Sequence, residues 1–148
     1  MNLSQWFHDQ LQASAEGFAW AIEQVPAERR RLAPPHQLGD WPAARHVFHM
    51  LYYEQIMALP SMQQWLGGPL LAADDLGEEA AWEKGPDLET LVAEFRKVRA
   101  EQIALLPKFD EALWHAPRPA IWGTVTLRWV VTKTYQHTAE HTHDVFWR

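Results

Sequence analysis

The spacing of apolar residues along the chain predicts four long helices, separated by segments that contain proline and glycine. The first helix is expected over residues 2–25, because apolar side chains recur there every three or four positions until Pro26. The second is expected over residues 40–59, with Asp40 as its N-cap and Pro60 as the residue that stops it. Together these two helices would form one half of the fold.

The same periodicity predicts two further helices in the second half of the chain. The third is expected to begin after Asp87, a suitable N-cap, and to end before Pro107. The last is expected over residues 126–147. Residues 125 and 129–131 favour a strand by composition, but helical periodicity continues through them, so we expect no strand.

Four apolar helix faces can be buried together most simply in an all-α, four-helix bundle. We therefore expect residues 1–148 to form a single domain of this kind, with a long connection between helices two and three over residues 60–86. A connection of that length suits a crossover between the ends of a bundle, or a lid over a site. The sequence leaves both alternatives open.

Composition indicates the cellular compartment of the protein and restricts the side chains available as metal ligands or nucleophiles. The chain is 47% hydrophobic with nine tryptophans, which is enough for a full core, and it contains no cysteine. Thiolate ligands and a cysteine nucleophile are therefore excluded. The N-terminal residues do not resemble a signal peptide, and no apolar run approaches the roughly 20 residues that span a bilayer. We expect a cytoplasmic protein without a membrane partner.

Charge argues against nucleic acid as a partner. The formal net charge is −6, whereas nucleic-acid-binding proteins usually present a basic face. The single basic cluster, Arg29–Arg31, falls in a segment between helices and is interpreted as a solvated loop. The prediction is that this protein binds neither DNA nor RNA.

Histidines on the apolar side of the last helix are the strongest chemical feature. His137 and His141 are four residues apart, so their side chains lie above one another on the side that also carries Val130 and Val145. Two imidazoles at this spacing can bind one metal ion, although core histidines with ordinary partners would show the same pattern. His49, near the middle of the second helix, is the best candidate for a third ligand.

The remaining histidines are weaker candidates. His46 lies one turn before His49 and is the alternative third ligand if the register differs by a turn. His8, His36 and His115 fall at a helix start or in loops and are interpreted as surface residues. His143 is two positions after a candidate ligand, points about 200° away from it and is excluded.

The chain resembles the DinB-like metalloproteins, which are four-helix bundles that include the bacillithiol S-transferases and are related to the mycothiol-dependent maleylpyruvate isomerases. The family pattern has a tryptophan at the start of helix two, a histidine eight residues later and an acidic residue five further on, here Trp41, His49 and Glu54. A Gly-Thr turn, here Gly123-Thr124, then precedes a last helix with H-x-x-x-H. The chain departs from many members at residues 142–144, where they have Arg-Gly-Gln.

The resemblance implies a metal ion held by His49, His137 and His141, with at least one coordination position open. Zinc or nickel would be the first choices, with iron or manganese as alternatives, since histidine nitrogen does not select among them. It also implies a divalent-metal-dependent transferase that activates a low-molecular-weight thiol. The alternatives are a non-enzymatic metal-binding stress-response protein acting as a dimer, and a bundle whose histidines belong only to its core.

Other residues have two interpretations each. Glu54 and Asp144 could accept the outer N–H of a ligating histidine, or be solvated carboxylates. Tyr52 and Tyr135 are interpreted as core residues rather than as the lining of a pocket. No catalytic residue is assigned, and whether the protein turns over a substrate stays open.

The tryptophan content also suggests an interface. Trp6, Trp20 and Trp147 are expected near helix ends or on outer faces, where aromatic side chains often mark contacts between proteins. We therefore expect a homodimer, with a small-molecule thiol and an electrophile as further partners.

Overall fold

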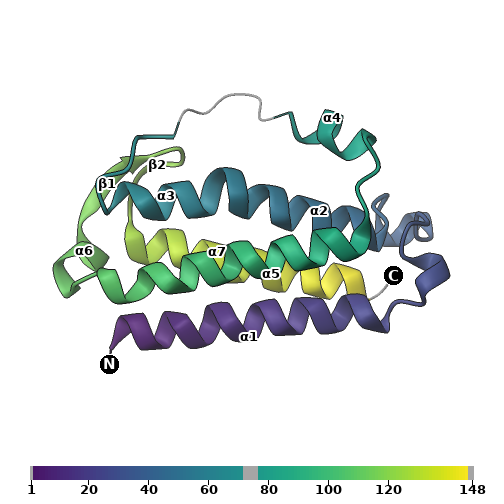
Figure 1. The fold of residues 1–148 in the computed structure, drawn as a ribbon, viewed down its shortest axis with the longest axis horizontal. Coiled ribbons are helices and arrows are strands. Elements are labelled where there is room, and N and C mark those ends of the chain that lie inside the picture. The colour runs from purple at the N-terminus through teal and green to yellow at the C-terminus, as the bar shows by residue number, and fades with distance from the viewer. Residues whose placement is uncertain (1, 72–76, 147–148) are drawn as a thin grey trace.

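Four long helices lie side by side and form a bundle in the computed structural model, which describes residues 2–71 and 77–146 (Figure 1). The all-α, four-helix-bundle prediction is therefore confirmed. Three of the four rods are single helices: α1 (Leu3–Gln24), α5 (Leu88–Leu105) and α7 (Leu127–Phe146). The second rod in chain order begins with α2 (Ala43–Tyr53). As predicted, the side chain of Asp87 caps α5 by accepting a hydrogen bond from the Thr90 N–H, at 3.0 Å.

The second rod is longer and less regular than predicted. After α2 the chain makes a π-helical turn, Glu54–Ala58, and continues directly as α3, Leu59–Gln64. Pro60 therefore does not stop the helix, and that prediction is wrong. The wider π turn ends two residues before the proline, and it contains the carbonyl, four residues earlier, against which an α-helix would bring the proline ring. Asp40 is not the N-cap either, because Pro42 occupies that position.

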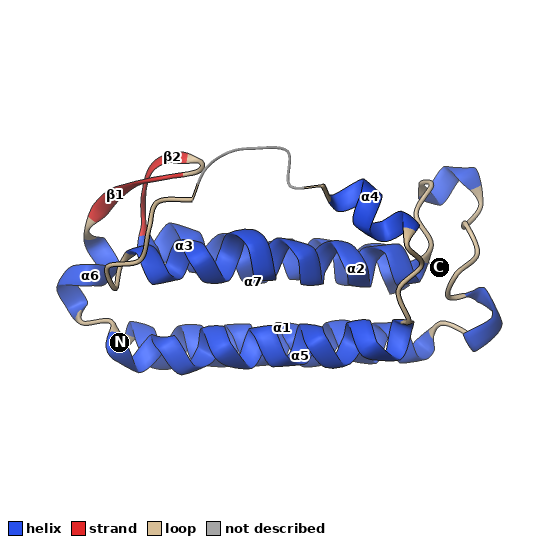
Figure 2. Ribbon diagram, turned by 45° about the horizontal axis from the view of Figure 1, so that its top comes forward, coloured by secondary structure: helices blue, strands red, loops and turns tan. Residues whose placement is uncertain are grey.

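A β-hairpin, which was not predicted, precedes the last helix. Strands β1 (Pro117–Ala120) and β2 (Gly123–Thr126) pair antiparallel, with Ala120 opposite Gly123 (Figure 2). Gly123 has a φ of +96°, which its lack of a Cβ allows. Each strand has four residues and the first contains two prolines, so there was too little alternation to recognise.

The connections contain several short helices. One of them, α4 (Glu78–Glu83), precedes α5 and lies on the outside of the bundle, against α2 (Figure 1). The others are the 3₁₀ turns Ala27–Arg29, His36–Leu38 and Leu106–Lys108, and the helix α6, Glu111–His115.

Two apolar clusters fill the bundle, one toward each end. The first is built around residues such as Phe18, Phe48 and Phe95, and the second around Phe7 and Trp114. Between them every long rod contributes buried or half-buried polar side chains. We call this set the polar layer; its members are Ser14, Glu54, Arg99, Gln102, Thr134 and Thr138.

Arg99 connects the members of the polar layer across all four rods. Its guanidinium forms an ion pair with Glu54 through both carboxylate oxygens, and both side chains are almost fully buried. It also donates to the Leu11 carbonyl at 2.6 Å, to the Ser14 hydroxyl at 2.9 Å and to the Thr138 hydroxyl at 2.7 Å. A buried charge needs such a complete set of partners to offset its desolvation.

The tryptophans proposed as interface residues lie in different environments. Trp6 is half-buried and packs edge-on against Phe7, at 5.1 Å between ring centroids. Trp20 is 52% exposed and stacks on Phe146. Trp147 lies outside the described residues.

The structure offers no membrane span among its described residues. None of the helices in residues 2–71 and 77–146 combines the length and the apolar character needed to cross a bilayer.

The polar layer yields a stability prediction. Arg99→Met leaves the Glu54 carboxylate buried without its cation, so the free energy of unfolding should fall by about 3–5 kcal/mol. The matched control, Arg96→Met, changes an exposed arginine on the same helix and should stay within about 0.5 kcal/mol of the parent. Urea unfolding followed by circular dichroism measures both. Equal stability of the two variants would contradict a structural role for the ion pair.

Candidate metal site

Three histidines from two rods converge on one point beside the polar layer. His49 comes from α2, and His137 and His141 come from successive turns of α7. The Nε2 atom of His137 lies 3.2 Å from that of His49 and 3.0 Å from that of His141. The three side chains predicted from the sequence are thus brought together, each of them half-buried.

The arrangement of these nitrogens fits a bound cation. Nitrogens that each lie about 2.0–2.1 Å from one tetrahedral ion are separated by about 3.3 Å, close to the two observed distances. The outer nitrogen of His49 faces a carboxylate and therefore carries the proton, so its Nε2 offers a lone pair. Lone pairs that face one another repel, and a cation between them would remove that repulsion. The three histidines therefore satisfy the donor requirements of a divalent metal.

The Nδ1 atoms of the three histidines point away from the shared Nε2 position, and each has a different environment. His49 Nδ1 donates to Glu78 Oε1 at 2.8 Å. His141 Nδ1 lies 2.7 Å from Nδ1 of His46, so one of these two imidazoles donates to the other. His137 Nδ1 is buried without a hydrogen-bond partner among the described residues. Two of the three rings are therefore held in orientation by a neighbour.

Glu78 fixes α4 against this cluster. The same carboxylate oxygen that accepts from His49 also accepts from Arg45 at 2.9 Å, and Arg45 pairs in addition with Glu79. The Arg45 guanidinium lies over the Trp41 indole, 4.5 Å from its centroid. Part of the 60–86 connection is thus tied to the site by charge and hydrogen bonds.

Two aromatic side chains border the histidines. The Trp41 ring centroid lies 5.1 Å from that of His49 and 6.2 Å from that of His141. The Tyr53 ring packs edge-on against His137 at 4.5 Å. Burial raises the pKa of Tyr53 well above its ordinary value of 10, so its hydroxyl stays protonated. The aromatic rings limit the access of water to the nitrogens.

The interior position of His137 suppresses its protonation. Burial, followed by the nearby imidazoles of His141 and His49 and then by Lys133, lowers the pKa of His137 from 6.5 to about 3. A neutral imidazole is the form that binds a metal. His137 is therefore kept in the state that a ligand requires over the physiological range of pH.

Other candidates from the sequence lie elsewhere. Glu54 does not accept from a ligating histidine but pairs with Arg99 in the polar layer. His46 is not in the cluster of three, yet it contacts His141, and the carboxylate of Asp144 lies near both. Among the histidines interpreted as surface residues, His8 pairs with its neighbour Asp9.

The residues missed from the sequence are Glu78, Arg45 and Tyr53. Tyr53 follows His49 by four positions, so helical spacing alone could have placed it beside the site. Glu78 sits in a connection that carries no periodic signal, and only its hydrogen bond to His49 identifies it.

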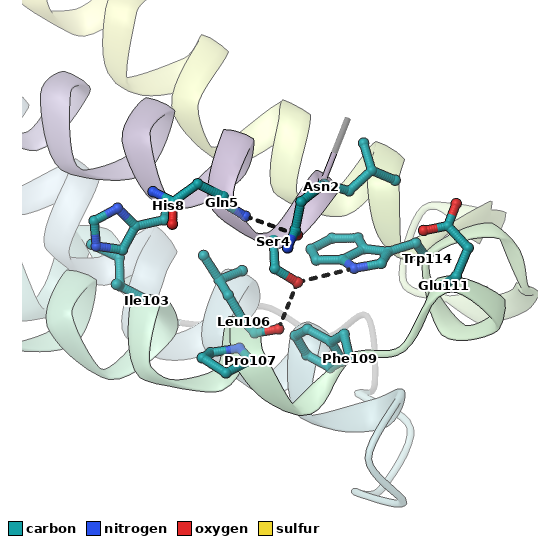
Figure 3. A pocket seen from close by; sticks show the side chains of 11 residues that line it. Asn2, Ser4, Gln5, His8, Ile103, Leu106, Pro107, Phe109, Glu111 and Trp114 are labelled. Atoms are coloured by element: carbon teal, nitrogen blue, oxygen red, sulfur yellow. Dashed lines mark hydrogen bonds between the residues drawn. The ribbon is translucent and has the colours of Figure 1, made fainter.

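The larger cavities lie away from the histidine cluster. One of about 540 Å³ lies where α1 begins, and its floor includes the Ser4 hydroxyl, which donates to the Leu106 carbonyl and accepts from the Trp114 indole (Figure 3). A smaller one, of about 370 Å³, borders His46 and His141 and includes Trp41 in its wall. This smaller cavity opens the His141 side of the cluster to solvent, beside Trp41.

Known proteins share this fold. A family model described as the DinB superfamily matches residues 10–145. A crystal structure of a Streptococcus pneumoniae protein, structural genomics target SpR36, is 11% identical with a TM-score of 0.73, and the match covers 96% of this chain and 87% of that one. The colibactin self-resistance protein ClbS, crystallised in complex with a dsDNA, is 11% identical with a TM-score of 0.75, covering 96% and 92%. No curated protein sequence matches.

The predicted exclusion of nucleic acid as a partner is wrong. ClbS, whose structure superimposes on nearly the whole of this chain, was crystallised with double-stranded DNA. Net charge averages over a whole surface, whereas binding to a phosphate backbone depends on how charge is distributed locally. A value of −6 therefore gives no ground for the exclusion. The comparisons do not show a homodimer.

The lowered pKa of His137 predicts how acid affects the metal-free protein. As pH falls below 6.5 the unfolded chain protonates this histidine while the native state does not, so stability is lost between pH 6.5 and about 3. Above 6.5 the group has no such effect. His137→Gln should therefore lose less melting temperature than the parent between pH 7.5 and pH 4.5, after treatment with a chelator. His8→Gln is the control, and equal losses in all three proteins would contradict the prediction.

Proposed function

This chain belongs to the DinB superfamily, and on that premise we propose that it is a divalent-metal-dependent transferase that activates a low-molecular-weight thiol. His49, His137 and His141 are the proposed ligands. The observation that carries the proposal is the convergence of their three Nε2 atoms, with 3.0 Å and 3.2 Å between neighbours. Three neutral imidazoles leave a coordination position for a ligand from solution, as in catalytic rather than structural metal sites.

The chemistry divides between the ion and the protein. A divalent ion at this site supplies Lewis acidity, which lowers the pKa of a thiol brought to it. The chain has no cysteine, so the thiol comes from solution. Its proton leaves to solvent, its sulfur forms a bond to the electrophilic carbon, and the leaving group departs with the electron pair of the bond that breaks.

The protein's own groups hold the site ready for this reaction. Glu78 keeps the His49 proton on Nδ1, so that Nε2 faces the cluster. Burial keeps His137 neutral. Trp41 and Tyr53 cover the imidazoles and restrict water, which strengthens the electrostatic interactions among the groups they enclose.

The proposed function also indicates which metal ion, which thiol and which cellular compartment are involved. Zinc or nickel is the proposed ion, with iron or manganese as alternatives, since histidine nitrogen alone does not select one of them. Bacillithiol, mycothiol or a related small thiol would be the nucleophile, as in the transferases that the sequence resembles. We propose a cytoplasmic location, since free thiols persist in a reducing compartment.

A second candidate function is metal binding without turnover, as part of a stress response. The geometry supports it because the histidine cluster accounts for metal affinity by itself, without any group assigned to proton transfer. The two candidates share the metal site and differ only in whether a thiol is consumed there.

The metal site predicts a defined stoichiometry. Untagged protein should contain one divalent ion per chain, and His49→Ala, His137→Ala and His141→Ala should each lose most of it, because two remaining imidazoles hold an ion weakly. Elemental analysis after dialysis measures the content. His8→Ala and His115→Ala are matched controls and should keep the ion. Full occupancy in His49→Ala would rule out the proposed ligand set.

The transferase proposal predicts metal-dependent consumption of thiol. The metal-loaded protein should accelerate the reaction of a small thiol with monobromobimane, chelation should abolish the acceleration, and a divalent ion should restore it. His137→Ala should be inactive, whereas His8→Ala should retain full activity. If the metal-loaded protein accelerates the reaction of none of the small thiols, the transferase proposal fails, and metal binding without turnover takes its place.

A further inference from the structure

Lys133 lies one helical turn before His137 on α7, between two tryptophans. Its ammonium is 5.9 Å from the ring centroid of Trp122 and 5.8 Å from that of Trp129. The two indoles contact each other, with 5.3 Å between their centroids. Trp122 comes from the turn of the β-hairpin, so the hairpin and the last helix together hold this lysine in place.

The three residues on α7 form a continuous row that leads to the histidine cluster. Trp129, Lys133 and His137 are separated by four residues each, so they follow one another along one side of the helix. Trp129 is 42% exposed, whereas Lys133 and His137 are half-buried. The row therefore passes from solvent to the cluster over about 12 Å of helix.

Lys133 differs in its charge partners from the two buried arginines of the bundle. Arg45 and Arg99 each have a carboxylate partner. In the part of the chain that the structure describes, Lys133 forms no ion pair, and its ammonium lies beside two indole faces. A cation that is partly removed from water and has no carboxylate partner gains from an anion of the ligand.

We propose that Lys133, Trp122 and Trp129 form a subsite that binds a carboxylate group of the small molecule that reacts at the histidine cluster. The ammonium would pair with the carboxylate, and the indole faces would pack against the adjoining carbon chain. The proposal rests on the proposed function and names the chemical class of its ligand: an acidic thiol or an acidic electrophile.

Electrostatics favours an anionic ligand at this position. Lys133 lies one helical turn from His137 on the same side of α7, so its positive charge acts at the cluster. The same charge would oppose a divalent cation held there. A ligand that carries a carboxylate at Lys133 offsets this repulsion, and a rise of four residues, about 6 Å, separates the two attachment points along the helix. A short aliphatic chain between sulfur and carboxylate spans such a distance.

The test compares ligands that differ only in charge. Binding of 4-mercaptobutyrate and of 4-mercapto-1-butanol to zinc-loaded protein is measured by calorimetry without an electrophile. The parent protein should bind the acidic thiol about fivefold more tightly, as expected for one partly exposed ion pair. Lys133→Gln should abolish the preference and Lys133→Arg should keep it. Lys97→Gln, which removes an exposed lysine from α5, is the matched control and should also keep it.

A second arm identifies which reactant carries the carboxylate. Rates with iodoacetate and iodoacetamide, each divided by its uncatalysed rate, are measured with the neutral thiol. A preference for iodoacetate that only Lys133→Gln loses assigns the subsite to the electrophile, and a preference confined to the thiol arm assigns it to the thiol. The proposal is overturned if the parent shows no charge preference in either arm, or if Lys133→Gln keeps it. Because the calorimetric arm needs no turnover, failure of the transferase proposal is seen separately.

Discussion

The ion pair between Arg99 and Glu54 constrains the rest of the structure. It lies in the middle of the bundle, between the two apolar clusters, and its partners come from all four rods. Sliding one helix past another would bury these charges without partners, which costs several kcal/mol, whereas apolar side chains would tolerate the shift better. The polar layer therefore fixes the axial register of the helices.

The three histidines converge only if the helices keep this axial register. Thr138, which bonds to Arg99, directly follows His137, and Glu54 directly follows Tyr53, whose ring packs on His137. The ion pair and the cluster are thus attached to the same segments of α7 and of the second rod. A displacement of one turn would move His137 by about 5.4 Å and separate the three nitrogens. The buried charges and the site are consequently parts of one arrangement.

Sequence periodicity predicted the helices and the ligand candidates because both depend on local spacing. His137 and His141 were identified by their four-residue separation, and His49 by its place in the second helix. Glu78 was missed, and Glu54 was offered instead, because the partner of His49 is chosen by the path of the long connection. The partner of a buried polar group is a tertiary property, which residue spacing within one helix does not contain.

The features that periodicity failed to predict position the residues beside Lys133. The π turn carries the second rod past Pro60, so that the rod reaches Gln64 and Trp65. There the Gln64 side chain donates to the Pro119 carbonyl at 3.2 Å, and the Trp65 indole donates to the Ala116 carbonyl at 3.1 Å.

These two hydrogen bonds attach the β-hairpin to the bundle, and the turn of that hairpin carries Trp122 to the side of Lys133. A helix that ended before Pro60 would provide neither donor. The π turn and the hairpin therefore determine which residues lie beside Lys133, one helical turn before His137. π turns are often found at functional sites.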